Sequence, residues 1–504
     1  MSIQSYDTVL HPFEAPTGPD KLTRPGFMAL MGAIILVLAL LFGRAGILGA
    51  GAVAGIVVAV GYGIFIFKRP IMGLYTAVAL DFVLIGLARY APSVQTGLGM
   101  DAILYVTYIA LFFNQFHQRI NWTPAKKEIT VLSAIWFAYS LFELLNPEAH
   151  NFEAWFSGRA IAMYMFLVTP LTLLLIDTRK KLDTILIIWG VFSILATLKG
   201  FMQLHMGVDR WEKAWLDAGN YKTHILFGRL RAFSFLSDAG QFGANQAYTG
   251  VVFMIASAAT RGWKKVFFVV VAVLGLYGMI MSGTRGAISI PLTGFSAYFV
   301  YRKNIWVLGS GFLLLFVVFY FFKFTSIGQS NPSIRRMRTA FDPNNASLQV
   351  RLDNQRKLRS YLASRPFGGG IGLGGVKAQR FKPNAYLSQV PTDSWYVLIW
   401  VEQGIVGLSL HLFILFYILI KSSYKIMFRI RNPQVQLQMA ALASGMFGVM
   451  VASYGNAVLG QMPTDILIYI SMAVLLHPEP FDDPKPEIIL RTNKKGPQGA
   501  RSPL

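Results

Sequence analysis

The run NIWVLGSGFLLLFVVFYFF, residues 304–322, contains no charged residue and is long enough to cross a bilayer as a helix. In lipid, a chain segment must satisfy its backbone hydrogen bonds internally, and a helix does so. Similar apolar runs recur along the chain, in which 54% of residues are hydrophobic and 14% are charged. This composition excludes a water-soluble globular protein and predicts an all-α integral membrane protein.

The apolar runs predict about fourteen transmembrane helices. Their cores lie near residues 26–43, 46–67, 71–90, 97–113, 128–145, 159–176, 182–201, 240–260, 264–281, 286–301, 304–322, 394–420, 437–455 and 463–477. The predicted organisation is a cytoplasmic segment 1–25, helices 1 to 11 over 26–322 with an outer loop at 202–239, a large periplasmic loop 323–393, helices 12 to 14 over 394–477, and a disordered cytoplasmic tail 478–504.

Positive charges in alternating short connections predict the orientation of these helices. Such pairs or clusters include Lys68 with Arg69, Lys126 with Lys127, Arg179 with Lys181, Lys264 with Lys265, and Arg302 with Lys303. Cytoplasmic loops carry the excess of Lys and Arg, so both termini are predicted to be cytoplasmic. The segments 202–239 and 323–393 then lie on the outer face of the membrane.

The segment 323–393 is strongly basic. Its cations are Lys323, Arg335, Arg336, Arg338, Arg351, Arg356, Lys357, Arg359, Arg365, Lys377, Arg380 and Lys382, against Asp342, Asp353 and Asp393. Long outer loops translocate largely regardless of charge, so topology does not explain this basicity. We expect the segment to bind something anionic. The absence of cysteine excludes disulfides, thiolate catalysis and Cys-ligated metals.

Two further stretches carry arginines at predicted outer ends of helices. Residues 282–286, SGTRG, present Arg285 between two apolar runs, and Arg229 and Arg231 precede the run at 240–260. Arginine offers planar, bidentate donors that suit phosphate. The alternative for Arg285 is an interfacial turn with a snorkelling side chain. The alternative for Arg229 and Arg231 is a solvated loop face, and their interpretation as phosphate ligands is favoured only if they lie beside Arg285.

Within the large loop, residues 346–364 read as an amphipathic helix, with Leu358 and Leu362 on its apolar side and Arg351 among its charges. Such a helix needs no catalytic role. Further on, Gly370 and Gly372 belong to a formal G-x-G-x-x-G that lacks the βαβ context of a nucleotide site. A tight turn that lets backbone amides approach a ligand remains open.

Asp393 precedes the apolar run at 394–420, and Glu402 lies inside that run. A carboxylate at the mouth of a span can act as general base toward a sugar hydroxyl. The alternative for Asp393 is a helix N-cap, and the two roles are compatible. Glu402 stays open between a site residue and a carboxylate that packs helices.

These pieces, in this order, resemble the O-antigen ligase and Wzy-type O-antigen polymerase superfamily of GT-C-like envelope glycosyltransferases. The matching stretches are residues 229–245, 282–286, Arg351, 365–375, and 392–394 ahead of 402–407. The resemblance implies metal-independent, inverting transfer of a glycan from undecaprenyl pyrophosphate to a glycan or lipid acceptor at the bacterial inner membrane, with the active site facing the periplasm. No cofactor or nucleic-acid partner is expected, whereas membrane lipid and a chain-length regulator are.

Carried over by position, the resemblance makes Arg285, Arg351 and Asp393 the expected catalytic residues. Those expected to bind substrate are Arg229, Arg231, Arg365, Gly370, Gly372 and Glu402. The ligases commonly have histidine where this chain has Asp393, and a carboxylate is ordinarily a weaker base than imidazole. A polymerase, or a ligase for a different acceptor, therefore fits equally well.

The alternative function is a transporter or flippase of lipid-linked oligosaccharide. It predicts internal pseudo-symmetry and charges spread along a central path. Here the long loops and the charges gather on one predicted face of the membrane, which favours the glycosyltransferase.

Overall fold

The computed structural model describes residues 55, 58–91, 97–117, 120–149, 151–226, 228–330, 332–339 and 346–482. The chain divides into two compact units, Met1–Lys68 and Arg69–Leu504. In the first unit the described part is a short apolar helix over Val58–Lys68. The predicted cytoplasmic segment 1–25, the span 26–43, half of the span 46–67 and residues 483–504 of the predicted tail lie outside the described residues.

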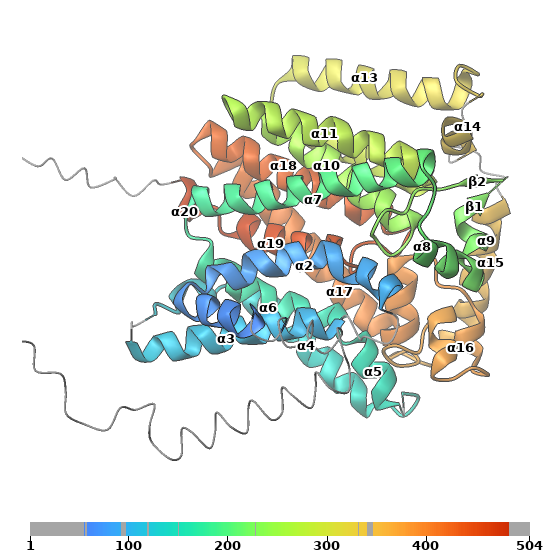
Figure 1. Cartoon of the computed structure of the whole chain (residues 1–504), viewed down its shortest axis with the longest axis horizontal. Coiled ribbons are helices and arrows are strands. Elements are labelled where there is room, and N and C mark those ends of the chain that lie inside the picture. Colours follow the sequence, from blue (N-terminus) through green and yellow to red (C-terminus); the bar gives the residue numbers. More distant parts are fainter. Residues whose placement is uncertain are drawn as a thin grey trace, which may run out of the picture. The chain divides into compact units, whose positions relative to one another are not determined.

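The second unit is almost entirely helical, as the sequence predicts (Figure 1). Its long helices are α2 (Ile71–Tyr90), α3 (Gly97–His117), α4 (Glu128–Phe142), α6 (Ala160–Leu175), α7 (Arg179–His205), α10 (Ala239–Ser257), α11 (Trp263–Ser282), α12 (Ser289–Tyr301), α13 (Ile305–Phe324), α17 (Trp395–Phe428), α18 (Pro433–Ala452) and α19 (Thr464–Leu476). Each predicted core from 71–90 onward coincides with one of these helices.

Shorter elements connect them. They are α5 (Phe152–Gly158), α8 (Arg210–Trp215), α9 (Tyr221–His224), the 3-10 turn Arg285–Ile288, α14 (Pro332–Arg338), α15 (Ala346–Leu362), α16 (Tyr386–Gln389), α20 (Glu479–Asp482), and the antiparallel strands β1 (Ile225–Leu226) and β2 (Arg229–Leu230). The predicted amphipathic helix is confirmed as α15. Its residues Leu358 and Leu362 are buried in a cluster with Leu387, Val390 and Val401.

Eight helices among the described residues are long and apolar enough to cross a membrane, or nine if α5 and α6, bent by 44°, count as one span. The eight are α2, α3, α4 with its extension to Leu145, α7, α11, α13, α17 and α18. The prediction of about fourteen spans is higher because it also counted α10, α12 and α19, and two runs in the first unit. Helix α19 is only 13 residues long, and polar side chains interrupt α10. The chain is a multi-pass membrane protein, and the count of fourteen stays a prediction.

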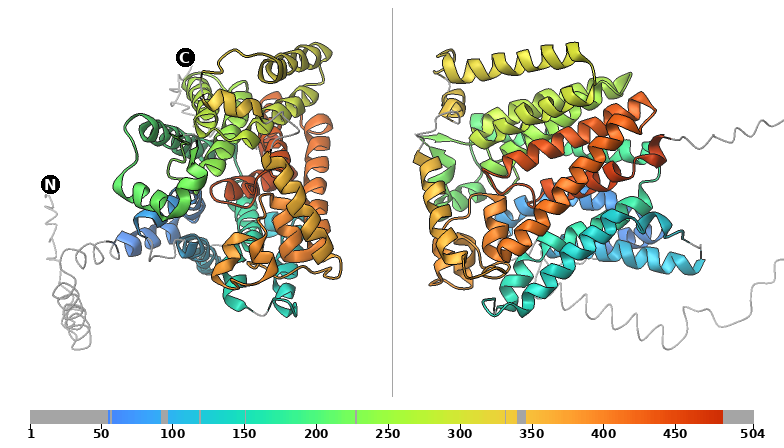
Figure 2. Two further views of the ribbon diagram at one scale, coloured as in Figure 1. Left: turned by 90° about the vertical axis from the view of Figure 1, so that its right-hand side faces the viewer. Right: turned by 180° about the vertical axis from the view of Figure 1, so that it is seen from behind.

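Helix α10 forms the centre of the second unit and packs against α7, α11, α12 and α18 (Figures 1 and 2). Glycines let α10 and α11 approach closely, since a Cβ on Gly275 would lie 2.8 Å from the carbonyl oxygen of Gln246. The Gln246 side chain in turn accepts a hydrogen bond from Ser193 at 2.9 Å. The amide groups of α10 therefore join helices.

The connecting elements gather at one end of the helices. Figures 1 and 2 show α8, α9, β1, β2, α14, α15 and α16 at this end, and α20 at the opposite end. The two long segments predicted to lie on one side of the membrane thus do lie at one end of the second unit. We call it the loop end.

Candidate anion-binding site

The turn after α11 projects Arg285 at the loop end. Gly283 ends α11 in the left-handed conformation, with φ 57°, which glycine adopts without steric cost. The hydroxyl of Thr284 donates a hydrogen bond to the carbonyl oxygen of Ala239 at 2.7 Å, so the turn is fixed to the start of α10. Arg285 then begins the 3-10 turn and donates to the Thr339 hydroxyl at 3.3 Å.

Arg231 lies against the same turn. Its guanidinium donates to the carbonyl oxygen of Ser282 at 3.1 Å, to the Thr284 hydroxyl at 2.9 Å and to the carbonyl oxygen of Thr223 at 2.9 Å. Burial and the neighbouring charge of Arg285, opposed by Asp238, lower the pKa of Arg231 to about 10. Arg231 therefore lies beside Arg285. This is the condition under which Arg231 becomes a candidate for phosphate binding.

A third arginine, Arg336 on α14, was not predicted. Its Cδ lies 3.5 Å from the position that a Cβ on Gly283 would occupy. Burial, followed by the charges of Arg231 and Arg285, lowers the pKa of Arg336 to about 10. Sequence alone does not separate it from Arg335 and Arg338 on the same short helix, because only packing decides which of them faces the turn.

Arg351 on α15 approaches from another direction and meets Asp393. Arg351 Nε and Asp393 Oδ2 are 3.5 Å apart, and the two side chains are 35% and 48% exposed. Burial and the charge of Arg351 lower the pKa of Arg285. Arg351 Nη1 lies 3.7 Å from the Cβ position of Gly455, and the amide of the next residue, Asn456, lies against Gly286 beside Arg285. The predicted catalytic residues Arg285, Arg351 and Asp393 thus come together from three separate parts of the chain.

Asp393 does not cap α17. The N-cap is Ser394, whose side chain accepts from the backbone N–H of Val397, so the N-cap interpretation of Asp393 is wrong. Ser394 is preferred at this position because its hydroxyl reaches an orphan amide of the first turn. The Asp393 carboxylate is left facing Arg351.

We call Arg231, Arg285, Arg336 and Arg351 the arginine cluster. Its positive charges are half-buried, and Asp393 and Asp238 are carboxylates of the described residues that lie near it. Half-buried like charges repel one another and lose hydration, so an anion is the ligand that such a site favours. Among the described residues, no group of three His, Asp or Glu side chains could hold a metal ion.

Two of the other predicted arginines lie outside this cluster. Arg229 is exposed on β2. Arg365 donates to Glu148 Oε1 at 3.2 Å and lies over the Tyr361 ring at 4.1 Å. These contacts fasten the large loop to the turn between α4 and α5.

The glycine-rich segment packs against a kink in α17. Gly370 and Gly372 have φ 98° and 78°, and the N–H of Gly370 donates to the carbonyl oxygen of Glu402 at 2.9 Å. The kink is at Gly404, where a Cβ would lie 1.9 Å from the carbonyl oxygen of Pro366. The close approach of two backbones explains why these positions are glycine.

The backbone amides of Gly372 and Gly374 face the Glu402 carboxylate. The residue is buried, with 4% exposure, and its Oε2 has no hydrogen-bond partner among the described residues. The amides of the glycine-rich turn thus lie against this carboxylate. Glu402 stays open between a site residue and a carboxylate that packs helices.

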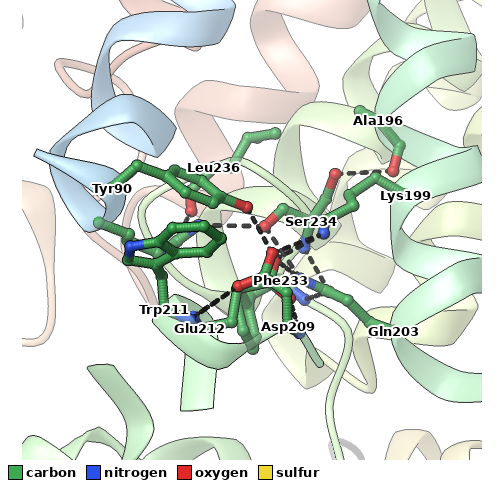
Figure 3. Close-up of polar contacts among 11 residues, drawn as sticks. Tyr90, Ala196, Lys199, Gln203, Asp209, Trp211, Glu212, Phe233, Ser234 and Leu236 are labelled. Carbon is green, nitrogen blue, oxygen red and sulfur yellow. Dashed lines mark hydrogen bonds and ion pairs between the residues drawn. The ribbon is translucent and has the colours of Figure 1, made fainter. Parts of the chain in front are cut away.

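A separate charged network fastens the connection between α7 and α10 to α2 and α7, and the sequence did not predict it. Figure 3 shows Lys199, Gln203, Asp209 and Glu212 converging. Lys199 Nζ lies 3.2 Å from Asp209 and 3.1 Å from Glu212, and Gln203 donates to Glu212 at 2.8 Å.

Arg89 belongs to the same network. It donates to the carbonyl oxygens of Ser234 and Ser237, each at 3.0 Å, and to that of Leu236. Its guanidinium lies 4.6 Å from the Trp215 ring centroid and 4.7 Å from that of Phe233. We call these residues the Arg89–Lys199 network.

The sequence is similar to those of known proteins. Residues 236–412 match the family described as O-antigen ligase. An O-antigen polymerase of Salmonella muenchen is 25% identical over 195 residues, which cover 37% of this chain and 45% of that protein. The match with this relative thus spans less than half of its length. The matched family range includes Arg285, Arg336, Arg351 and Asp393, and excludes Arg231.

Proposed function

We propose that this chain, whose residues 236–412 belong to the O-antigen ligase and polymerase superfamily, is a membrane glycosyltransferase of surface-polysaccharide biosynthesis. The family resemblance that the sequence indicates is confirmed. In this proposal the donor is a glycan on undecaprenyl pyrophosphate, and the acceptor is a hydroxyl of a second glycan or a lipid. The reaction takes place at the outer face of a bacterial inner membrane, with both termini in the cytoplasm.

The observation that carries this proposal is the convergence of Arg285, Arg351 and Asp393. Arg285 and Arg351 come from different elements, and both lie beside the Gly455–Asn456 connection, Arg351 through Gly455 and Arg285 through Gly286. Such a pair can bind the donor pyrophosphate and stabilise the charge that develops on it as the bond to the anomeric carbon breaks. Because the guanidinium groups bring their own charge, this step needs no metal ion.

Asp393 supplies the base in this mechanism. It lies 3.5 Å from Arg351, so a carboxylate stands directly beside the proposed phosphate site. A partly exposed ion pair at this distance contributes little free energy, so a phosphate oxygen can replace the Asp393 carboxylate as the partner of Arg351. The released carboxylate then orients and deprotonates the acceptor hydroxyl, which attacks the anomeric carbon opposite the leaving pyrophosphate and inverts its configuration.

The remaining predicted substrate-binding residues have supporting roles in this proposal. Arg231 braces the 282–284 turn through its three hydrogen bonds and adds positive charge beside Arg285. Binding of substrate by Arg229, Arg365, Gly370, Gly372 and Glu402 stays a prediction. The observed contacts of the last four hold the large loop on α4, α5 and α17.

The test is transfer by the purified protein supplied with a glycan on undecaprenyl pyrophosphate, with lipid-linked glycan length followed on a gel. Arg285→Ala is measured beside it, with Arg359→Ala on the exposed side of α15 as the matched control. Chains that lengthen and fail to do so in Arg285→Ala identify a polymerase, and a single transfer to a separate acceptor identifies a ligase. Absence of transfer together with translocation across vesicles contradicts the proposal and favours the transporter.

A further inference from the structure

We propose that Arg336 on α14 and Asn456, in the connection between α18 and α19, are two further hydrogen-bond donors of the same site. Asn456 binds the phosphate group held by Arg285 and Arg351, and Arg336 binds the second phosphate group of a diphosphate ligand. The inference rests on the proposed function, because it takes the arginine cluster as the site of the donor pyrophosphate. It adds two binding residues that neither the sequence reasoning nor the family description assigns.

The three arginines of α14 have different surroundings. Arg338 donates to the carbonyl oxygens of Phe321 at 2.8 Å and Ile327 at 2.6 Å, so it binds the end of α13. Arg335 is exposed. Arg336 lies against Gly283, and its buried Nε, like that of Arg338, has no hydrogen-bond partner among the described residues. Of the three, Arg336 is the arginine that lies against the turn carrying Arg285.

Asn456 brings an uncharged donor to the same place. Its Nδ2 is buried without a hydrogen-bond partner in the part of the chain that the structure describes. A Cβ on Gly286 would lie 2.0 Å from this nitrogen, so the amide sits against the turn that carries Arg285. The preceding residue, Gly455, faces Arg351, whose Nη1 is 3.7 Å from the position of a Cβ there. Asn456 thus lies between Arg285 and Arg351.

These unsatisfied groups are all donors. A buried donor without a partner costs free energy, so the site favours an occupant that accepts hydrogen bonds and carries negative charge. Phosphate oxygens meet both requirements, as do those of a carboxylate or a sulfate, whereas a sugar hydroxyl also donates and carries no charge. Under the proposed function, the occupant with this chemistry is the diphosphate of the lipid-linked donor.

Arg336 and Arg351 reach the turn that carries Arg285 at different points. Arg336 Cδ lies 3.5 Å from the Cβ position of Gly283, whereas Arg351 Nη1 lies 3.7 Å from the Cβ position of Gly455, next to Asn456. A phosphate group held by Arg285 and Arg351 therefore leaves Arg336 for the next phosphate group.

The experiment measures binding of two probes, undecaprenyl pyrophosphate and undecaprenyl phosphate, to the full chain in lipid nanodiscs by native mass spectrometry. Arg336→Ala is expected to weaken binding of the pyrophosphate lipid by roughly 10-fold or more and binding of the monophosphate lipid by less. Arg336→Lys keeps the charge but loses the bidentate donors of the guanidinium, so its affinity for the pyrophosphate lipid should lie between those of the wild type and Arg336→Ala. The matched control Arg335→Ala should bind both lipids as the wild type does.

Asn456→Asp tests the role of Asn456 independently of Arg336. It replaces a donor by a carboxylate of nearly the same shape, so it should weaken pyrophosphate binding more than Asn456→Ala does. Equal affinity of wild type, Arg336→Ala and Asn456→Asp for the pyrophosphate lipid, with Arg285→Ala still impaired, overturns this inference and leaves the proposed function standing. A wild type that binds neither lipid overturns both. If Arg336→Ala does not purify as a folded protein, Arg336→Lys and Asn456→Asp decide the matter.

Discussion

Two groups of cations lie at the loop end, and they differ in what their donors meet. In the Arg89–Lys199 network, Arg89 donates to three backbone carbonyl oxygens, and Lys199 meets two carboxylates. In the arginine cluster, Arg351 lies 3.5 Å from Asp393, whereas the Nε of Arg336 is buried without a hydrogen bond to a described residue and the charges of Arg231 and Arg285 repel this arginine. A buried cation is therefore not in itself a sign of a binding site. The sign is a cation whose donors the protein leaves unsatisfied.

The largest expected effect is that of Asp393→Asn, which removes the proposed base from the cluster without removing volume. Loss of a general base reduces rates by about 10²- to 10⁴-fold. Because Asp393 is about half exposed and does not cap α17, the thermal unfolding midpoint should stay unchanged. Transfer rates and unfolding curves of the purified variant check this. Full activity in Asp393→Asn would exclude the base role.

Arg89→Ala should lower stability, because it removes hydrogen bonds of the Arg89–Lys199 network. Binding of the lipid donor by the folded protein should be unchanged. Hydrogen bonds from a charged group each contribute about 1.5–3 kcal/mol, so loss of Arg89 should clearly lower the unfolding midpoint. Lys213→Ala, an exposed cation of α8, is the control and should leave the midpoint in place. The comparison between the two regions fails if Arg89→Ala is as stable as the wild type but cannot bind the lipid donor.

A smaller effect is expected from Arg365→Ala, which lies outside both regions. Its ion pair with Glu148 is partly exposed, and such pairs contribute about 0–1 kcal/mol. Stability should fall by no more than about 1 kcal/mol, and the affinity for a pyrophosphate lipid should be that of the wild type. A loss of affinity as large as that of Arg285→Ala would place Arg365 in the binding site and widen the cluster.

The smallest effect is expected from Arg356→Ala. Arg356 pairs with Asp353 on the exposed side of α15, with side chains 75% and 55% exposed. Neither stability nor transfer should change measurably, because exposed pairs three residues apart on a helix contribute only a few tenths of a kcal/mol. A clear fall in transfer would show that the positive charge of the loop as a whole, and not the four clustered arginines, attracts the donor.

Much of the fold follows from the sequence, because apolar runs of bilayer length can form only helices in lipid. Helix α13 follows the uncharged run 305–322 and buries only Gly311 in the described part of the chain, as a span that faces lipid would. The number of spans is harder to predict, since α10 is buried along its length yet carries Gln241, Asn245 and Gln246. Hydropathy does not show whether such amides join helices or line a site.

Part of the candidate site was predictable for a chemical reason. Arg285 interrupts an apolar pattern, and Asp393 stands at the mouth of a span, so both are conspicuous in the sequence. Arg336 is one of several similar arginines in a basic loop, and its orientation depends on how α14 packs on Gly283. The contact between Glu402 and the Gly372 amide likewise arises from a long-range approach of two backbones that local sequence does not encode.

The central claim is that the arginine cluster binds the pyrophosphate of a lipid-linked donor. The most direct measurement is titration of undecaprenyl pyrophosphate against the wild type and Arg285→Ala in nanodiscs, with Arg359→Ala as the control. We expect Arg285→Ala to bind at least about 10-fold more weakly with an unchanged unfolding midpoint, and Arg359→Ala to bind as the wild type does. Equal affinity of all three proteins for this lipid would contradict the claim.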